Sequence, residues 1–295
     1  MADEVILEKD GAIARLILNR PEKHNALSFA GLDELVEALH KAEDDDEIKV
    51  IILKGRGPSF CAGHDYDDAV RSYGLAREGS ANTAEGESGE SEQKPRRPSQ
   101  RSRLQRDRKL AENYMAFQYS IKPIIAQVHG HCIGAGMYLV ELVDLAIAAD
   151  TAKFSHAEQR LGLAGNTWQL NAQILMYGPK RAREVLLLAE EFNGRRAAEL
   201  GLVNRSVPEN DLESTVESWA RKVARHPKDA LVMGKAVHQM ALDDLGYTQQ
   251  FWRGYVGHSL STNIKYEPED YNFLRERSQR GTRGAFHGRE EHFGG

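Results

Sequence analysis

The chain has 295 residues, 41% of them hydrophobic and 28% charged, with a formal net charge of −5 at pH 7. This size and composition suit a globular protein with a large core, and the acidic balance argues against a whole surface that binds nucleic acid. No apolar run reaches the roughly 18 residues of a membrane span, and the start of the chain lacks the basic and apolar segments of an export signal, so we expect a cytoplasmic protein.

The first half of the chain alternates strand-like and helix-like patterns. Apolar runs at residues 5–7 and 13–18 flank Asp10 and Gly11 and predict a β-hairpin. A helix is expected from about Ser28, because its hydroxyl suits an N-cap and apolar residues follow at helical spacing.

Two continuous apolar runs, at residues 50–53 and 123–128, predict strands that are buried on both faces. A second helix is expected to start near Gly134, and residues 145–148 form another short strand-like run. Because strands and helices alternate to about residue 190, we predict an α/β fold.

From about Pro208 onward the pattern is helical. Apolar residues at helical spacing predict one amphipathic helix just after this proline, and further helices are expected around residues 228–243, 246–260 and 267–279. The sequence therefore predicts a helical C-terminal region rather than more sheet.

Residues 72–109 show no core pattern. From Arg77 to Gln93 the chain has five glutamates and no large apolar residue, and from Lys94 to Lys109 it has eight lysines or arginines against one aspartate. Such a stretch is typical of a solvated, flexible loop, which is our prediction. The alternatives are a mobile lid whose arginines contact an anionic ligand, and a segment that binds RNA.

Two glycine-containing segments point to the chemistry: residues 60–65, FCAGHD, and residues 130–136, GHCIGAG. Each places small residues after an apolar run, where backbone N–H groups can point at a ligand. Two such donors from separate loops can hold a developing oxyanion, which suggests acyl chemistry on a carbonyl. Each segment also contains one of the two cysteines, Cys61 and Cys132, which we expect to be reduced thiols.

Other chemistries fit the sequence poorly. The glycine-rich segment is not GxGxxG, and no acidic residue is placed for a ribose, so a dinucleotide site is not expected. No GxSxG occurs, which argues against a Ser-His-Asp hydrolase. His129 and His131 alternate along an extended segment without a third ligand, so we expect no metal site.

Four segments occur in a characteristic order: residues 20–27, RPEKHNAL; residues 60–65; residues 123–136; and residues 197–203, AAELGLV. This order resembles the crotonase family, also called the enoyl-CoA hydratase/isomerase superfamily, over most of residues 3–260. The resemblance implies a crotonase-like spiral of ββα units in residues 1–205. It also implies a helical region in residues 206–295 that assists trimerisation, and hence a homotrimer or a dimer of trimers.

By that resemblance, the backbone N–H groups of His64 and Ala135 would form an oxyanion hole for a thioester carbonyl. Fixed amides in a dry site stabilise the negative charge that builds on this oxygen. The helix that starts near Gly134 would add a favourable partial charge. Family members usually have glycine where this chain has Ala135.

Family members place catalytic carboxylates at two positions, which here fall on Tyr138 and Glu158. A tyrosine with a pKa of about 10 is a poor general base at neutral pH, so Tyr138 is either a pocket wall or a proton donor. Glu158 is the candidate acid/base, because a lone glutamate suffices to carry a proton between two carbons, as in some family isomerases. The alternative for Glu158 is a surface carboxylate that is paired with Arg160.

The resemblance also implies substrate-binding residues: Lys23 and His24 near the CoA phosphates, Ala62 and Asp65 beside the adenine through backbone contacts, and Gly63 and Gly134 in the loops that hold the thioester. Lysines suit phosphates because they are mobile charges.

The implied function is that of an acyl-CoA-processing enzyme, which hydrates an enoyl-CoA or shifts its double bond through a thioester enolate. No separate cofactor is expected, since coenzyme A arrives on the substrate. The alternatives are another lyase, decarboxylase or hydrolase of the same superfamily, and a non-catalytic or RNA-binding member. In a decarboxylase, the side chain of His64 could contact a substrate carboxylate.

Overall fold

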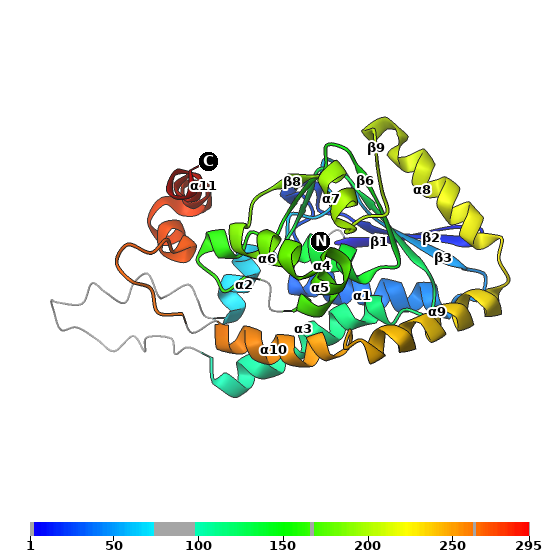
Figure 1. The fold of residues 1–295 in the computed structure, drawn as a ribbon, viewed down its shortest axis with the longest axis horizontal. Helices are drawn as coiled ribbons and strands as arrows, with labels where there is room; N and C mark the ends of the chain where they lie inside the picture. The colour runs from blue at the N-terminus through cyan, green and yellow to red at the C-terminus, as the bar shows by residue number, and fades with distance from the viewer. Residues whose placement is uncertain (1–2, 74–97, 166–167, 262–263, 295) are drawn as a thin grey trace.

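The computed structural model describes residues 3–73, 98–165, 168–261 and 264–294 (Figure 1). Within them the larger sheet has six strands in the order β1-β2-β3-β4-β6-β9. Their bounds are β1 Val5–Asp10, β2 Ile13–Leu18, β3 Val50–Gly55, β4 Ile124–Val128, β6 Leu145–Ala149 and β9 Arg205–Val207.

The sheet confirms the predicted α/β pattern. β1 and β2 form the expected antiparallel hairpin, and every other neighbouring pair in this sheet is parallel. β4 is buried along its whole length, and β3 is buried except at Lys54, as their continuous apolar sequences predict.

A smaller sheet joins β5 His131–Ile133, β7 Lys153–Ser155 and β8 Phe192–Asn193. Next to it, Cys61 and Cys132 face each other in an isolated parallel bridge, through which the segment after β3 pairs with β5. Both thiols are free and buried. The two glycine-containing segments are therefore held together through their backbones.

Helices surround the sheets. Their bounds are α1 Phe29–Asp44, α2 Tyr66–Tyr73, α3 Gln100–Gln118, α4 Ala135–Leu142, α5 Leu170–Tyr177, α6 Pro179–Leu188, α7 Gly194–Leu200, α8 Glu209–Ala224, α9 Lys228–Asp244, α10 Gln249–Ser261 and α11 Phe273–Phe293, with 3-10 turns at Pro21–Lys23 and Gln159–Leu161. Ser28 caps α1 as expected, because its Oγ accepts from the Gly31 N–H at 2.8 Å. No helix in the described part of the chain combines the length and the apolar character that crossing a bilayer requires.

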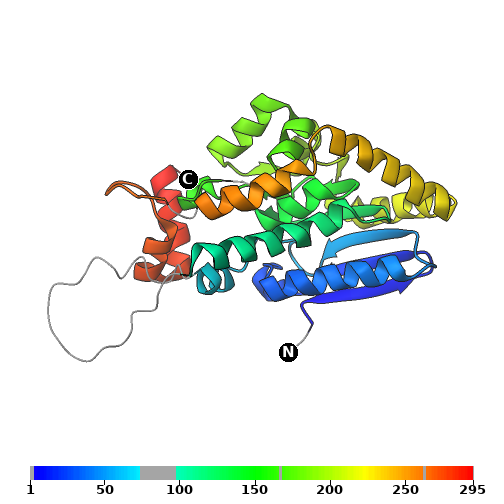
Figure 2. The same ribbon diagram turned by 90° about the horizontal axis from the view of Figure 1, so that it is seen from below.

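The prediction of a loop over residues 72–109 is wrong for residues 72–73, which end α2, and for residues 100–109, which form the first half of α3. Residues 74–97 of that predicted loop lie outside the described residues. Figures 1 and 2 show α3 beside α10, and the contact is polar: Arg103 donates to the Ser259 backbone oxygen at 2.9 Å, and Ser259 Oγ donates to Asp107 at 2.7 Å. These partners offset the burial of two charged side chains, so the helix buries residues that the sequence pattern assigned to solvent.

The C-terminal region is helical, as predicted. α9 and α10 lie close to the expected ranges, whereas α11 starts later than residue 267 and extends to Phe293. α11 also contains a break at Gly281, where φ is 71°.

Candidate active site

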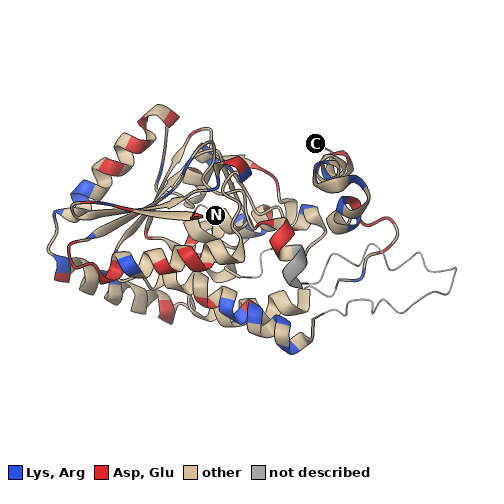
Figure 3. Cartoon of the chain, turned by 180° about the vertical axis from the view of Figure 1, so that it is seen from behind, with Lys and Arg blue, Asp and Glu red and all other residues tan. Residues whose placement is uncertain are grey.

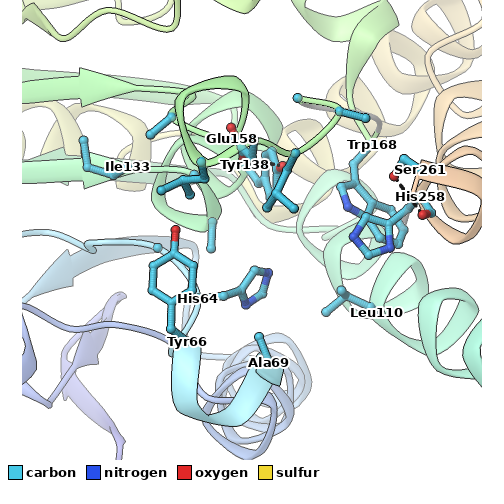
Figure 4. A pocket seen from close by; sticks show the side chains of 18 of the residues that line it. His64, Tyr66, Ala69, Leu110, Ile133, Tyr138, Glu158, Trp168, His258 and Ser261 are labelled. Carbon is cyan, nitrogen blue, oxygen red and sulfur yellow. Dashed lines mark hydrogen bonds between the residues drawn. The ribbon is translucent and has the colours of Figure 1, made fainter. Parts of the chain in front are cut away.

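A cavity of about 180 Å³ lies between the two glycine-containing segments, α3, α10, residues 157–165 and Trp168 (Figure 4). Most of the predicted site residues line it: Ala62, Gly63, His64, Gly134, Ala135, Tyr138 and Glu158. Lys23, His24 and Asp65 are not among its lining residues. The rest of the wall is mainly apolar and aromatic, with Leu110 and Trp168 on the side of α3 and α10.

Backbone pairing fixes the two segments relative to each other. Cys61 N–H donates to the His131 oxygen at 2.9 Å, and Ile133 N–H donates to the Cys61 oxygen at 3.0 Å. Gly63 and Gly134 have φ of 108° and 48°, which an L side chain rarely adopts. A Cβ on Gly134 would also lie 3.5 Å from Glu158 Oε1, so the glycine leaves space between the loop and the carboxylate.

The backbone N–H groups of His64 and Ala135 take no part in the hydrogen bonds of the segments around them. The Leu27 N–H donates to the Gly63 oxygen, and the Leu27 oxygen accepts from the Asp65 N–H. The N–H of His64, which lies between Gly63 and Asp65 in the sequence, takes no part in either bond. Ala135 is the first residue of α4, where an N–H has no acceptor within the helix. Within the described residues, neither N–H donates to a protein atom. Both residues line the cavity.

Tyr138 and Glu158 are hydrogen-bonded to each other, with the Tyr138 hydroxyl donating to Glu158 Oε1 at 2.8 Å (Figure 4). Burial and the charge of Glu158 raise the pKa of Tyr138 well above its usual range, so its phenol stays neutral. Arg160 contacts Glu290 at 2.8 Å instead of Glu158, so the surface ion pair considered as an alternative does not form. Tyr138 is thus both a wall residue and a donor to the candidate acid/base.

A buried histidine lies behind this pair. His156 Nε2 is 2.9 Å from Glu141 Oε1, and His156 Nδ1 is 3.7 Å from Glu158 Oε2. Burial by itself would lower the pKa of His156, but the charges of Glu141 and Glu158 raise it to about 10. Burial would raise the pKa of Glu158, yet His156 and the Tyr138 hydroxyl bring it below its ordinary value. Both shifts favour an imidazolium at His156 beside an ionised Glu158.

The His64 side chain is neutral at physiological pH. Burial, and then the nearby His258, lower the pKa of His64 to about 4. Its Nε2 is 3.0 Å from the Tyr114 hydroxyl, which fixes the ring. A neutral ring offers no charge to a substrate carboxylate, so the geometry gives no support to the decarboxylase alternative for this side chain.

The predicted CoA-binding residues form a separate cluster beside the cavity. Asp65 accepts from Arg20 at 2.9 Å and from Lys23 at 3.0 Å. Burial would raise the pKa of Asp65, but these two cations lower it to about 2. His24 Nδ1 is 3.0 Å from Ser59 Oγ, and the His24 oxygen accepts from the Ala62 N–H at 3.0 Å.

This arrangement ties the predicted phosphate and adenine residues into one network. The N–H of Asp65 donates to Leu27, and its carbonyl accepts from Ala69, so both backbone groups have partners within the fold. The adenine contact and the phosphate contact stay predictions.

The sequence patterns assigned no role to Glu141, Tyr114 or His156. One signal for Glu141 was present: it is an acidic residue in an otherwise apolar helix, three positions after Tyr138. Positions three apart share a helix face, so this spacing would have placed the two side chains on one side of α4.

Comparisons with known proteins indicate the family to which the chain belongs. A sequence model of the enoyl-CoA hydratase/isomerase family matches residues 8–87 and 88–263. A solved enoyl-CoA hydratase/isomerase from Xanthobacter autotrophicus Py2 is similar with a TM-score of 0.82 and 26% identity, covering 98% of this chain and 97% of that chain.

Two mycobacterial structures are also similar. A probable enoyl-CoA hydratase from Mycobacterium smegmatis has a TM-score of 0.74 and 27% identity, covering 88% of this chain and 95% of that chain. A probable enoyl-CoA hydratase from Mycobacterium thermoresistibile has a TM-score of 0.74 and 27% identity, covering 87% and 94%. The family match over most of the chain, together with the shared fold, shows that this protein belongs to the enoyl-CoA hydratase/isomerase family of the crotonase superfamily.

Proposed function

We propose that the protein binds an acyl-CoA thioester in this cavity and moves a proton on it with Glu158. The observation that carries the proposal is the meeting of an ionised, partly accessible carboxylate with two loops whose His64 and Ala135 N–H groups lack protein acceptors in the described residues. A thioester carbonyl placed between those N–H groups would be polarised. Each such donor typically contributes about 10²–10³ in rate.

The site supports double-bond isomerisation better than hydration. Hydration needs one group to activate water and another to protonate carbon. Glu158 is the only carboxylate among the described lining residues, and the neutral Tyr138 is committed to it as a donor. One carboxylate can take a proton from one carbon and return it to another, with the electrons held meanwhile as an enolate.

Coenzyme A would enter on the substrate, and the reaction needs no further cofactor. We place the CoA phosphates near Lys23 and His24. Lys23 is half-exposed, and its ammonium is bound to Asp65, so a phosphate could draw it away without disturbing the core. Arg20 would keep Asp65 paired when this happens.

We further propose that the chain assembles into a homotrimer or a dimer of trimers. α9 has no buried residue, yet Met233, Val237 and Met240 follow one another at helical spacing and are 62%, 61% and 67% exposed. On α10, Trp252, Val256 and Leu260 are also exposed and lie four positions apart. Such stripes on a folded chain are typical of interaction surfaces.

An acyl-CoA panel tests the proposed activity. Purified protein is assayed for hydration, double-bond isomerisation and CoA release, and Glu158→Gln is expected to lose at least about 10²-fold in kcat while still binding acyl-CoA. Glu290→Gln is the matched control, since it neutralises a carboxylate that pairs with Arg160 outside the cavity. Undiminished turnover in Glu158→Gln would remove this residue from the mechanism, and CoA release as the main reaction would favour a hydrolase.

A further inference from the structure

We propose that His156 and Glu141 are a positioning pair for Glu158: His156, as an imidazolium held by Glu141, keeps Glu158 in its carboxylate form and fixes its direction toward the cavity. The proposal rests on the proposed role of Glu158 and adds two residues that do not line the cavity. It explains how a carboxylate can be a ready base in an apolar wall, where burial alone would protonate it.

Several hydrogen bonds hold the Glu141 carboxylate in place. It is 2% exposed, and its Oε1 accepts from Tyr177 Oη at 2.9 Å and from Gln173 Nε2 at 3.0 Å, besides the His156 contact. With its amide nitrogen turned toward the carboxylate, Gln169 donates to Glu141 Oε2 at 2.8 Å. A buried carboxylate with this many donors is held in one orientation.

His156 bridges the two carboxylates from a fully enclosed position. It is 1% exposed, with Glu141 at one ring nitrogen and Glu158 at the other. The Tyr138 ring packs on it at 5.4 Å between ring centres. Two flanking carboxylates favour protons on both ring nitrogens, because each nitrogen then faces an acceptor.

The position of Gln173 bears on how many protons the His156 ring carries, because Gln173 Nε2 lies 2.7 Å from His156 Nε2. That contact would suit a neutral ring with an accepting Nε2. In that state, however, Nε2 and Glu141 Oε1 would be two acceptors 2.9 Å apart. With Nε2 protonated, His156 and Gln173 both donate to Glu141 Oε1. We assign a second proton to Nδ1, and hence the imidazolium, because Nδ1 faces the Glu158 carboxylate and has no other partner in the described residues.

The contact with Glu158 is electrostatic in the resting structure. His156 Nδ1 and Glu158 Oε2 are both buried without a hydrogen-bond partner in the described residues, and they face each other at 3.7 Å. The Tyr138 hydroxyl donates to the other oxygen of Glu158, Oε1. The charge of Glu158 also acts on the pKa of Tyr66 and of His64. His156 is the one cation among these neighbours, so it carries the stabilisation of the carboxylate.

The pair also constrains the proton transfer. When Glu158 takes a proton, a substrate C–H bond breaks, an O–H bond forms on Glu158, and the C–H electron pair moves into the thioester carbonyl. In the return step the O–H bond breaks, a C–H bond forms at the other carbon, and the enolate electrons shift the double bond. His156 keeps its own protons throughout, so the cycle balances without a further acid.

A titration of the unliganded protein tests the charge directly. With ¹⁵N-histidine labelling, and His156 assigned by difference from His156→Gln, we expect imidazolium signals at about pH 8, well above the ordinary histidine pKa of about 6.5. A neutral His156 at that pH overturns the proposal. Because this measurement needs no substrate, it judges the pair even if the acyl-CoA panel shows no turnover and the proposed function fails.

The pH dependence of kcat/KM tests the coupling. His156→Gln removes the charge that favours ionised Glu158. The acidic limb of the profile, where kcat/KM falls because Glu158 becomes protonated, is therefore expected to move to a pH higher by about one unit or more. Glu141→Gln is expected to move the limb in the same direction, by weakening the imidazolium, but to add nothing in the His156→Gln background. Equal shifts of Glu141→Gln in both backgrounds would mean that Glu141 acts independently, which contradicts the proposal.

Tyr177→Phe is the matched control, since it removes one donor to Glu141 and leaves both charges of the pair. It is expected to keep the acidic limb near its wild-type position, and a shift as large as that of His156→Gln would assign the effect to general packing instead. Should His156→Gln fail to fold, His156→Asn takes its place, both for assigning the His156 signal and as the background for Glu141→Gln.

Discussion

Tyr138 places an uncharged hydroxyl beside Glu158 in the wall of the cavity. Its neutral hydroxyl donates to Glu158 Oε1, so one of the carboxylate oxygens is held while Oε2 faces His156. A hydrogen bond to a charged group contributes about 1.5–3 kcal/mol. Tyr138 therefore lowers the pKa of Glu158 and restricts its rotation at the same time.

Tyr138→Phe is expected to lower kcat by about ten- to a hundredfold, because the base loses a donor and becomes less well oriented. The acidic limb of the rate profile should also move upward, since the donor favours the ionised form of Glu158. Steady-state kinetics across pH measure both effects. An unchanged kcat would leave Tyr138 as a wall residue only.

At the scale of single residues, the sequence was sufficient where a function depends on one segment. The loop residues His64 and Ala135 and the acid/base candidate Glu158 lie in recognisable segments, and the structure brings them to one cavity. Glu141 and His156 are different, because their importance comes from a contact between α4 and the segment after β7. A pattern along the chain does not report such a contact.

Among the elements, the start of α4 is packed directly on the segment after β3. A Cβ added to Gly136 would lie 2.6 Å from the Cys61 oxygen and 3.1 Å from Cys61 Cβ. The absence of a side chain at Gly136 therefore sets how closely Ala135 can approach the 60–65 segment.

Gly136→Ala is expected to push α4 away from this segment, lowering both kcat/KM and the free energy of unfolding, the latter by about 1–3 kcal/mol. Gly234→Ala is the matched control: it makes the same change inside α9, where a new Cβ meets nothing within 4 Å. That variant should be as stable as the wild type or slightly more so. Denaturant unfolding and acyl-CoA kinetics measure the difference, and equal behaviour of the two variants would contradict close packing as the cause.

The elements also show where sequence patterns fail. β3, β4 and the C-terminal helices follow apolar periodicity, and they were predicted. The first half of α3 was not, because its buried face includes Arg103 and Asp107, whose partners lie on α10 more than 150 positions away. Its remaining basic side chains are partly or fully exposed and appear blue in Figure 3, which is why the segment resembled a solvated loop.

For the whole molecule, the apolar stripe of α9 is the feature that a single chain leaves unexplained. The charged residues of α9 lie mostly near its ends, at Lys228, Asp229, Asp243 and Asp244, with Lys235 between them. The helix thus has a mainly uncharged middle that a second copy could cover.

The double variant Met233→Glu with Met240→Glu is expected to reduce the proposed trimer or hexamer to monomers, because it buries two charges if the copies associate. Light scattering against the 33.0 kDa mass of one chain measures the state. Lys228→Glu changes charge on the same helix without touching the stripe, and it should leave the assembly intact. A wild-type protein that is already monomeric would contradict the proposed assembly.

The two opposed cysteines have a practical consequence for measuring motion at the cavity. Burial raises the pKa of Cys61 to about 12 and that of Cys132 well above its ordinary value, so neither is a nucleophilic thiolate in the closed protein. Alkylation by a small reagent then requires the paired backbones to separate first. The rate at which the intact protein gains label, followed by mass spectrometry with and without an added thioester, would report how often the two glycine-containing segments come apart and whether a bound thioester restrains them.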